Sequence, residues 1–120
     1  MPRSSATILL LEENAAVQEL IDQALRESGH RILTTNNALE ALELLQRVHV
    51  DVIVIGELVD ESGPTLVEEL RTLQAGVRVI SIAADELDGV DDCVRLPSPI
   101  ALDDLREAAA AQIDGATERT

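Results

Sequence analysis

The fold of this chain is most constrained by an alternation of short, continuous apolar runs with longer stretches whose apolar residues recur at helical spacing. Residues 6–11 form a run of strand length. The next stretch repeats apolar residues at the spacing of one helix face, at Ala16, Val17, Leu20, Ile21, Ala24 and Leu25. Gly29 then stands where a left-handed helix cap favours glycine. Such alternation predicts β-α-β units around a parallel sheet.

The same alternation continues along the rest of the chain. Residues 31–35 predict a second strand, after which Asn36 or Asn37 caps a helix with the apolar stripe Leu39, Leu42, Leu45 and Val48. Residues 52–55 are apolar at four successive positions, which predicts a central strand buried on both faces. The remaining predicted elements are a helix from Pro64 that buries Leu66, Val67, Leu70 and Leu73, strands at 77–82 and 93–96, and a last helix at 101–113.

Length and charge limit the classes of protein that the chain can belong to. Its 120 residues suit one domain, which we place at 6–113 between an N-terminal tail, 1–5, and a polar C-terminal tail, 114–120. The formal net charge of -14 disfavours direct binding to nucleic acid or to an anionic membrane, and it suits a basic protein partner. No apolar run approaches the length of a membrane span and no signal peptide is evident, so we expect a cytoplasmic protein.

Three segments of the sequence resemble the response-regulator receiver domain of two-component signalling. They are ATILLLEEN at 6–14, NNALEALELL at 36–45 and DVIVIG at 51–56. The resemblance implies an α/β fold of the flavodoxin-like, CheY-like kind, a doubly wound five-stranded parallel sheet with strand order 2-1-3-4-5. A receiver carries a whole helix between its fourth and fifth strands. Only five residues separate Ala83 from Gly89, so we expect that fourth helix to be missing or reduced to a loop.

The resemblance places Gly56 at the position of the aspartate that accepts a phosphoryl group in receivers. Glycine has no side chain to phosphorylate, and the alternative register, with Glu57 at that position, does not restore the aspartate. The acidic pair that holds Mg²⁺ in the family corresponds to Glu12 and Glu13. Two flexible glutamates without the third carboxylate would hold Mg²⁺ only weakly.

The other parts of the receiver mechanism are also missing from the positions that the resemblance assigns to them. Ala83 takes the place of the hydroxyl residue, because Ser81 lies one pleat deeper. Ser98 takes the place of the lysine, or Leu96 does if the register is counted from Asp92. Cys93 or Arg95 stands near the place of the aromatic switch residue, and Cys93, the one cysteine, is expected to be a buried inert thiol. We therefore expect neither an enzyme nor a bound cofactor.

These losses favour a pseudo-receiver that signals through protein–protein interaction without phosphorylation. The candidate partner surface is an acidic loop, for which a merely solvated loop is the alternative, with the residues Asp85, Glu86, Asp88, Asp91 and Asp92. The resemblance also suggests a homodimer through the face of the fourth strand and the last helix. Two other functions stay open. One is a receiver that binds Mg²⁺ or phosphate through Glu12 and Glu13 plus another acid, Glu57 or Asp60. The other is a flavodoxin-like module that senses a small ligand in a pocket opened by the missing side chain at Gly56 and the missing fourth helix.

Overall fold

The computed structural model describes residues 6–56, 63–74, 76–82, 93–96 and 101–118. Within them the elements follow one another as β1 (Thr7–Leu11), α1 (Ala15–Glu27), β2 (Arg31–Thr35), α2 (Ala38–Leu45), β3 (Val52–Ile55), α3 (Gly63–Leu73), β4 (Arg78–Ile82), β5 (Cys93–Leu96) and α4 (Leu102–Glu118). Strands and helices alternate up to β4, as the spacing of apolar residues predicted. The expected loss of a helix between β4 and β5 concerns residues 83–92, which lie outside the described part of the chain.

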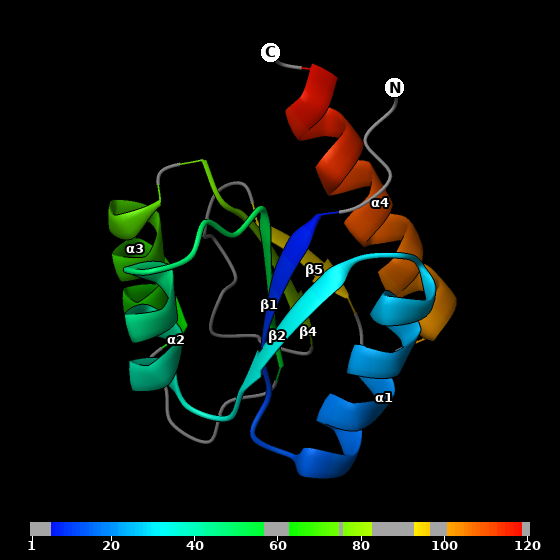
Figure 1. Cartoon of the computed structure of the whole chain (residues 1–120), viewed down its shortest axis with the longest axis horizontal. Helices are drawn as coiled ribbons and strands as arrows, with labels where there is room; N and C mark the ends of the chain where they lie inside the picture. The colour runs from blue at the N-terminus through cyan, green and yellow to red at the C-terminus, as the bar shows by residue number, and fades with distance from the viewer. Residues whose placement is uncertain (1–5, 57–62, 75, 83–92, 97–100, 119–120) are drawn as a thin grey trace.

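The strands form one parallel sheet in the order β2-β1-β3-β4-β5. Helices cover both of its faces, with α2 and α3 on one side and α1 and α4 on the other (Figure 1). This three-layer α/β architecture with a parallel sheet confirms the fold class expected from the sequence. Parallel strands all end at the same edge of the sheet, so the segments that follow β1, β2 and β3 come together there.

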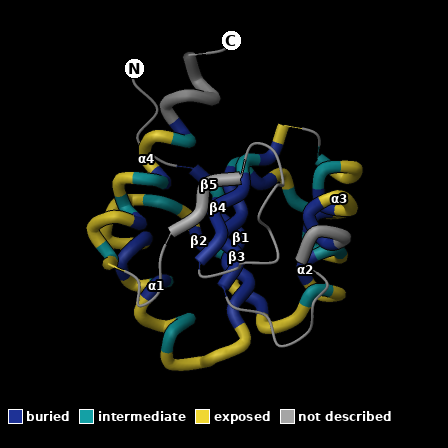
Figure 2. Tube along the Cα trace, turned by 180° about the vertical axis from the view of Figure 1, so that it is seen from behind, coloured by how far each residue is buried: buried dark blue, intermediate teal, exposed yellow. Residues whose placement is uncertain are grey.

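The core consists of two aliphatic clusters, one on each face of the sheet. Figure 2 shows the buried central strands between helices that carry many exposed residues. Alternate residues of each strand contribute to opposite clusters: Leu9 and Ile53 face α2 and α3, whereas Ile8 and Val52 face α1 and α4. All four residues of β3 are buried, which confirms the prediction of a central strand. Because the sequence contains no Phe, Tyr or Trp, Leu, Ile, Val and Ala fill both clusters.

Short polar residues and one glycine set the ends of the first two helices. Asn14 caps α1 by accepting from the backbone N–H groups of Ala16 and Val17. Gly29 follows α1 with a φ of 93°, the left-handed conformation predicted for it. Of the two candidate caps for α2, Asn37 is the cap, and its side chain accepts from Glu40 N at 2.8 Å.

The predicted apolar stripe of α2 is wrong at its first residue. Leu39 is 68% exposed, and the fully buried positions of α2 are Ala41 and Leu45. Residues spaced by three, such as Leu39, Leu42 and Leu45, drift around a helix of 3.6 residues per turn, whereas a spacing of four keeps Ala41 and Leu45 on one face. In the same way Leu20 of α1 and Leu73 of α3 are exposed rather than buried.

The last helix is longer than predicted, because α4 continues to Glu118 and does not end at residue 113. No proline follows Ile113, and the single glycine there, Gly115, costs a helix only about 1 kcal/mol. No helix in the described part of the chain is long and apolar enough to cross a membrane.

Candidate functional site

The candidate site lies at the edge of the sheet where β1 and β3 end side by side. Leu11 pairs with Ile55 in the parallel register, so Glu12 and Gly56 are the next residues of the two strands. Gly56 N donates to Leu11 O at 2.8 Å, and Glu12 N donates to Thr35 O at the end of β2 at 3.1 Å. In open α/β sheets this edge is where ligands bind, at the point where neighbouring strands connect in opposite directions.

The two glutamates predicted as an acidic pair differ in their surroundings. Glu12 is only 5% exposed, whereas Glu13 is exposed. The Glu12 carboxylate accepts from Asn14 N through Oε2 at 3.2 Å, directly before the first turn of α1. The amino end of a helix carries a partial positive charge and favours an anion beside it. The pair is therefore divided between a buried and a solvent-facing carboxylate.

The Glu12 carboxyl group occupies the space beside Gly56. A Cβ atom built on Gly56 would overlap Glu12 Oε1, and it would lie 2.6 Å from Cδ and 3.0 Å from Oε2. Cβ atoms in proteins essentially never approach other heavy atoms below 3.0 Å. The volume that a side chain at position 56 would need is thus taken by a side chain from the neighbouring strand.

Polar contacts from α1 and β2 hold the backbone of Glu12 in place. Gln18 of α1 donates through Nε2 to Glu12 O at 3.3 Å and to Thr35 O at 2.9 Å. Thr35 is itself buried, and its Oγ1 donates to Asn37 O at the start of α2. Gln18 thereby joins the ends of β1 and β2 beneath the candidate site.

Ser81 lies below the edge of the sheet. In the register of β3 and β4 it pairs with Ile55, one residue before Gly56, and it is completely buried. Ala83, the position relative to which Ser81 was predicted to lie one pleat deeper, is outside the described residues. The Ser81 Oγ has no hydrogen-bond partner among the described residues.

The two glutamates are the residues that the sequence suggested for Mg²⁺. Among the described residues no group of three or more His, Cys, Asp or Glu side chains converges as metal ligands would. Mg²⁺ requires oxygen ligands in near-octahedral geometry, and of the two glutamates Glu12 is buried and Glu13 is exposed.

The structure brings together only some of the residues predicted for the site. Gly56 and Glu12 are in contact, and Glu13 is their exposed neighbour. Cys93 begins β5, but its side chain and that of Arg95 are not described. The other predicted positions lie outside the described residues: Glu57, Asp60, Ala83, Ser98 and the acidic loop residues Asp85, Glu86, Asp88, Asp91 and Asp92.

Sequence reasoning missed two contributors, Gln18 and Thr35, and it missed the contact between Glu12 and Gly56. A signal for that contact was present in the sequence: a long acidic side chain ends one strand, and a residue without a side chain ends another. The helical pattern of α1 gave no reason to select Gln18. Its amide donates to two backbone carbonyl groups, and the sequence does not show which backbone groups lie within its reach.

Comparison with families of known proteins gives one match of wide coverage. Residues 8–96 match the model of the response regulator receiver domain. The sensor kinase CckA of Brucella abortus is 33% identical over 82 residues, which cover 66% of this chain and 9% of the kinase. The transcriptional regulator NtrC of Azospirillum brasilense is 29% identical over 82 residues, covering 68% of this chain and 17% of the regulator. The chain thus spans less than a fifth of the length of these two relatives.

Solved structures show the same fold. A CheY-like receiver domain from Methanospirillum hungatei superposes with a TM-score of 0.85 at 20% identity, covering 98% of this chain and 100% of that one. The receiver domain of a sensor histidine kinase from Pseudomonas aeruginosa, with a magnesium ion coordinated in its active-site cleft, gives a TM-score of 0.77 at 24% identity, covering 92% and 98% of the two chains.

Proposed function

This chain belongs to the response regulator receiver domain family of two-component signalling, and from that premise we propose that it is a pseudo-receiver, a non-enzymatic module that works through phosphorylation-independent protein contacts. The observation that carries the proposal is the pair Glu12 and Gly56. The acceptor position has no side chain, and the neighbouring carboxylate fills the space in which one would stand.

The chemistry of phosphoryl transfer supports this assignment. The acceptor must present a carboxylate oxygen in line with the leaving group of the donor, and cations must neutralise the charge that develops on phosphorus. Gly56 offers no oxygen. Glu12 offers one, but the residue is only 5% exposed and lies against backbone. A small phosphodonor therefore has no accessible nucleophile at these two positions.

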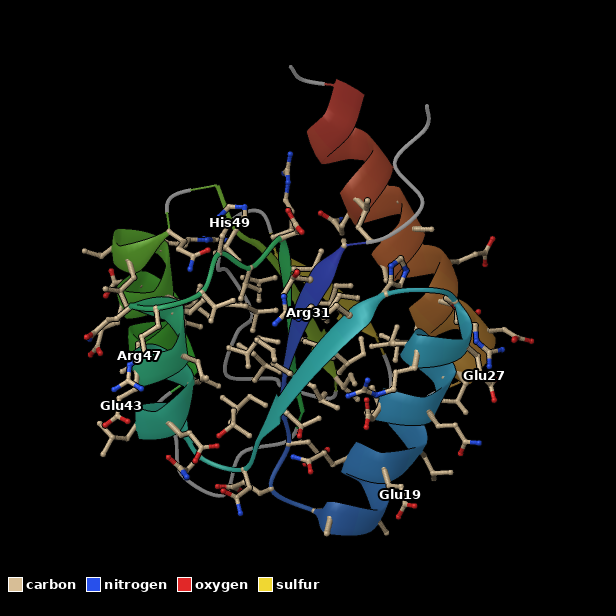
Figure 3. The ribbon with its side chains drawn as sticks, viewed as in Figure 1. Glu19, Glu27, Arg31, Glu43, Arg47 and His49 are labelled. Carbon is tan, nitrogen blue, oxygen red and sulfur yellow. The ribbon has the colours of Figure 1, made fainter. Side chains whose placement is uncertain are left out.

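Without phosphoryl transfer, this protein would signal through the surfaces around the site. The chain carries a formal charge of -14, and the described helices expose acidic side chains, among them Glu19 and Glu27 of α1 and Glu43 of α2 (Figure 3). Such a surface attracts a partner with clustered Lys or Arg and repels nucleic acid. The acidic loop Asp85, Glu86, Asp88, Asp91 and Asp92 is the surface that we assign to this partner. A homodimer through the face of β4 and α4 remains a further prediction.

Exposure to small phosphodonors tests the absence of phosphorylation. The chain is incubated with acetyl phosphate and Mg²⁺, and separately with beryllofluoride and Mg²⁺. A receiver that keeps its acceptor aspartate serves as the control for reagent quality. We expect no phosphoryl adduct in the intact mass and no shift of backbone amides by NMR. An adduct on this chain overturns the proposal, and one on Glu57 or Asp60 establishes the alternative acidic acceptor.

Neutralisation of the acidic loop tests the partner surface. Asp85, Glu86, Asp88, Asp91 and Asp92 are replaced by Asn or Gln, and binding to proteins captured from the native cell is measured at two salt concentrations. A matched variant neutralises five exposed acids of the helices instead: Glu19, Glu40, Glu43, Glu68 and Glu107. We expect a larger loss of binding and a smaller remaining salt dependence for the loop variant than for the helix variant, because only the loop acids are assigned to direct contact with the partner. Equal binding by both variants contradicts the assignment.

The ligand-sensing alternative has less support. It requires a pocket opened at Gly56 by the loss of a side chain, and the Glu12 carboxyl group takes up that space. A ligand-dependent rise in melting temperature would restore this alternative.

A further inference from the structure

We propose that the Glu12 carboxyl group occupies the acceptor site of this receiver. The site is then filled by a side chain of the protein itself and is not merely left empty by the glycine. The inference deepens the proposed function and rests on it only for the assignment of Gly56 to the acceptor position. Glu12 and Gly56 then form one matched pair, in which the long side chain at the end of one strand occupies the space left by the missing side chain of the other.

Packing is the first argument. The three atoms nearest to a Cβ on Gly56 all belong to the Glu12 carboxyl group. Among the described glycines, Gly29 is the one with a positive φ, so Gly56 does not have one. The backbone conformation of Gly56 therefore does not by itself require glycine. Among the described residues, the nearest obstacle to a side chain at position 56 is therefore Glu12.

The anchoring of Glu12 is the second argument. Its backbone is held by Thr35 O and by Gln18 Nε2, and its carboxylate receives the Asn14 N–H. The side chain is buried at 5% exposure, so a displaced carboxylate must give up the Asn14 N–H and its place at the amino end of α1. Making room at position 56 consequently carries a free-energy cost.

Charge is the third argument. An aspartate at position 56 would place a second carboxylate against that of Glu12. Two carboxylates that share one site disfavour each other's charged forms as long as no cation is bound between them. Glu12 thus opposes the return of an acceptor both by its volume and by its charge.

A double-mutant cycle tests the pair. Gly56→Ala is introduced into the natural chain, into a Glu12→Ala background and into a Glu13→Ala background, where the exposed neighbour serves as the matched control. Melting is followed by circular dichroism. We expect Gly56→Ala to lower the melting temperature by about 5 °C in the natural and Glu13→Ala backgrounds and by clearly less in Glu12→Ala. An equal drop in all three backgrounds overturns the proposal. If Glu12→Ala does not fold, the shorter Glu12→Asp replaces it in the cycle with the same expectation.

An NMR measurement follows the position of the Glu12 carboxylate directly and does not depend on the global stability of the protein. The amide proton of Asn14 reports on its hydrogen bond to the Glu12 carboxylate. We expect Gly56→Ala to displace that carboxylate and to shift the Asn14 amide resonance in the natural and Glu13→Ala backgrounds but not in Glu12→Ala, each compared with its own background. An Asn14 resonance that is unchanged by Gly56→Ala overturns the proposal. Neither measurement involves a phosphodonor or a partner, so this inference and the proposed function can fail separately.

Discussion

At the scale of single residues, Gly29 and Gly56 are needed for different physical reasons. Gly29 adopts a φ of 93°, which side chains with a Cβ rarely tolerate. Gly56 has no such conformation, and its lack of a side chain makes room for Glu12. One glycine is required by its own backbone and the other by a neighbouring strand.

Replacing Gly29 by alanine is expected to destabilise the protein. An alanine in the left-handed region costs about 1 kcal/mol, because its Cβ approaches the following carbonyl oxygen. Gly76→Ala is the matched control, since nothing lies within 4 Å of a Cβ built there and its φ is not positive. Thermal unfolding should show a loss for Gly29→Ala and little change for Gly76→Ala. A comparable loss in both variants would contradict this reading of Gly29.

His30 makes the stability of the protein depend on pH. Burial lowers the pKa of His30 below its usual value of 6.5. The unfolded chain therefore takes up the proton first as the pH falls through 6.5, which favours the unfolded state. Relative to His30→Gln, the natural protein should lose stability as the pH falls below 6.5, and the two should change in parallel above that pH. Denaturant unfolding at several pH values gives the comparison, and parallel curves throughout would refute the prediction.

The chemistry of the site could be predicted in part from single residues. The glycine at the end of the third apolar run and the glutamate at the end of the first were both visible in the sequence. Their contact was not, because it depends on the parallel register that sets Leu11 beside Ile55 and on the rotamer of a buried glutamate. The spacing of residues within one strand specifies neither the register between strands nor the rotamer of Glu12.

At the scale of elements, Gln74 connects the end of α3 to the segment between α2 and β3. Its Oε1 accepts from Val50 N at 2.9 Å, and its Nε2 donates to Leu45 O at 3.0 Å and to Val48 O at 2.6 Å. Val50 is buried, so water does not readily replace the amide. The Gln74 side chain thus supplies hydrogen bonds to three backbone groups at the end of α2 and in the segment before β3.

Gln74→Ala should destabilise the protein by about 2 kcal/mol, because it leaves a buried backbone donor and two acceptors without their partner. Gln74→Glu should also destabilise it, since a carboxylate cannot donate to Leu45 O and Val48 O. The control is Gln23→Ala on the exposed face of α1, with an expected change within about 0.5 kcal/mol. Denaturant unfolding measures all three, and similar values for the changes at positions 74 and 23 would contradict the role of Gln74.

Helix α2 shows where pattern reasoning failed at this scale. A stripe of leucines attracted the prediction, yet the small Ala41 is buried and Leu39 is exposed. The leucine stripe identified the helix and its buried Leu45, but it included the exposed Leu39 and omitted the buried Ala41. The angular spacing of Ala41 and Leu45, together with the close approach of α2 to the sheet, decides that face.

At the scale of the whole molecule, the parallel sheet and its helices followed from the sequence because short runs dominated by aliphatic residues, most clearly β1 and β3, alternate with stretches of helical spacing. The position of each helix end did not follow as well. Helix α4 runs past residue 113 because helix termination depends on small differences among capping, propensity and packing.

The net charge of -14 should make the folded state sensitive to salt. Raising the ionic strength from about 0.01 M to about 0.1 M shortens the Debye length from about 30 Å to about 10 Å and screens the mutual repulsion of the acidic groups. We expect the melting temperature to rise over this range. The measurement requires circular dichroism, because the chain has no aromatic residue to report by fluorescence. A constant or falling melting temperature would show that local ion pairs outweigh the net repulsion.

The overlap of Glu12 with a side chain at position 56 also bears on the evolutionary reversibility of this protein. The glycine codons GGT and GGC become aspartate codons through one base change, so from either of them the acceptor lies a single mutation away. With Glu12 in place that mutation must displace a buried carboxyl group, and shortening residue 12 beforehand removes this cost. The order of the two substitutions therefore matters, and this epistasis between strands acts as a ratchet against regaining a lost chemistry.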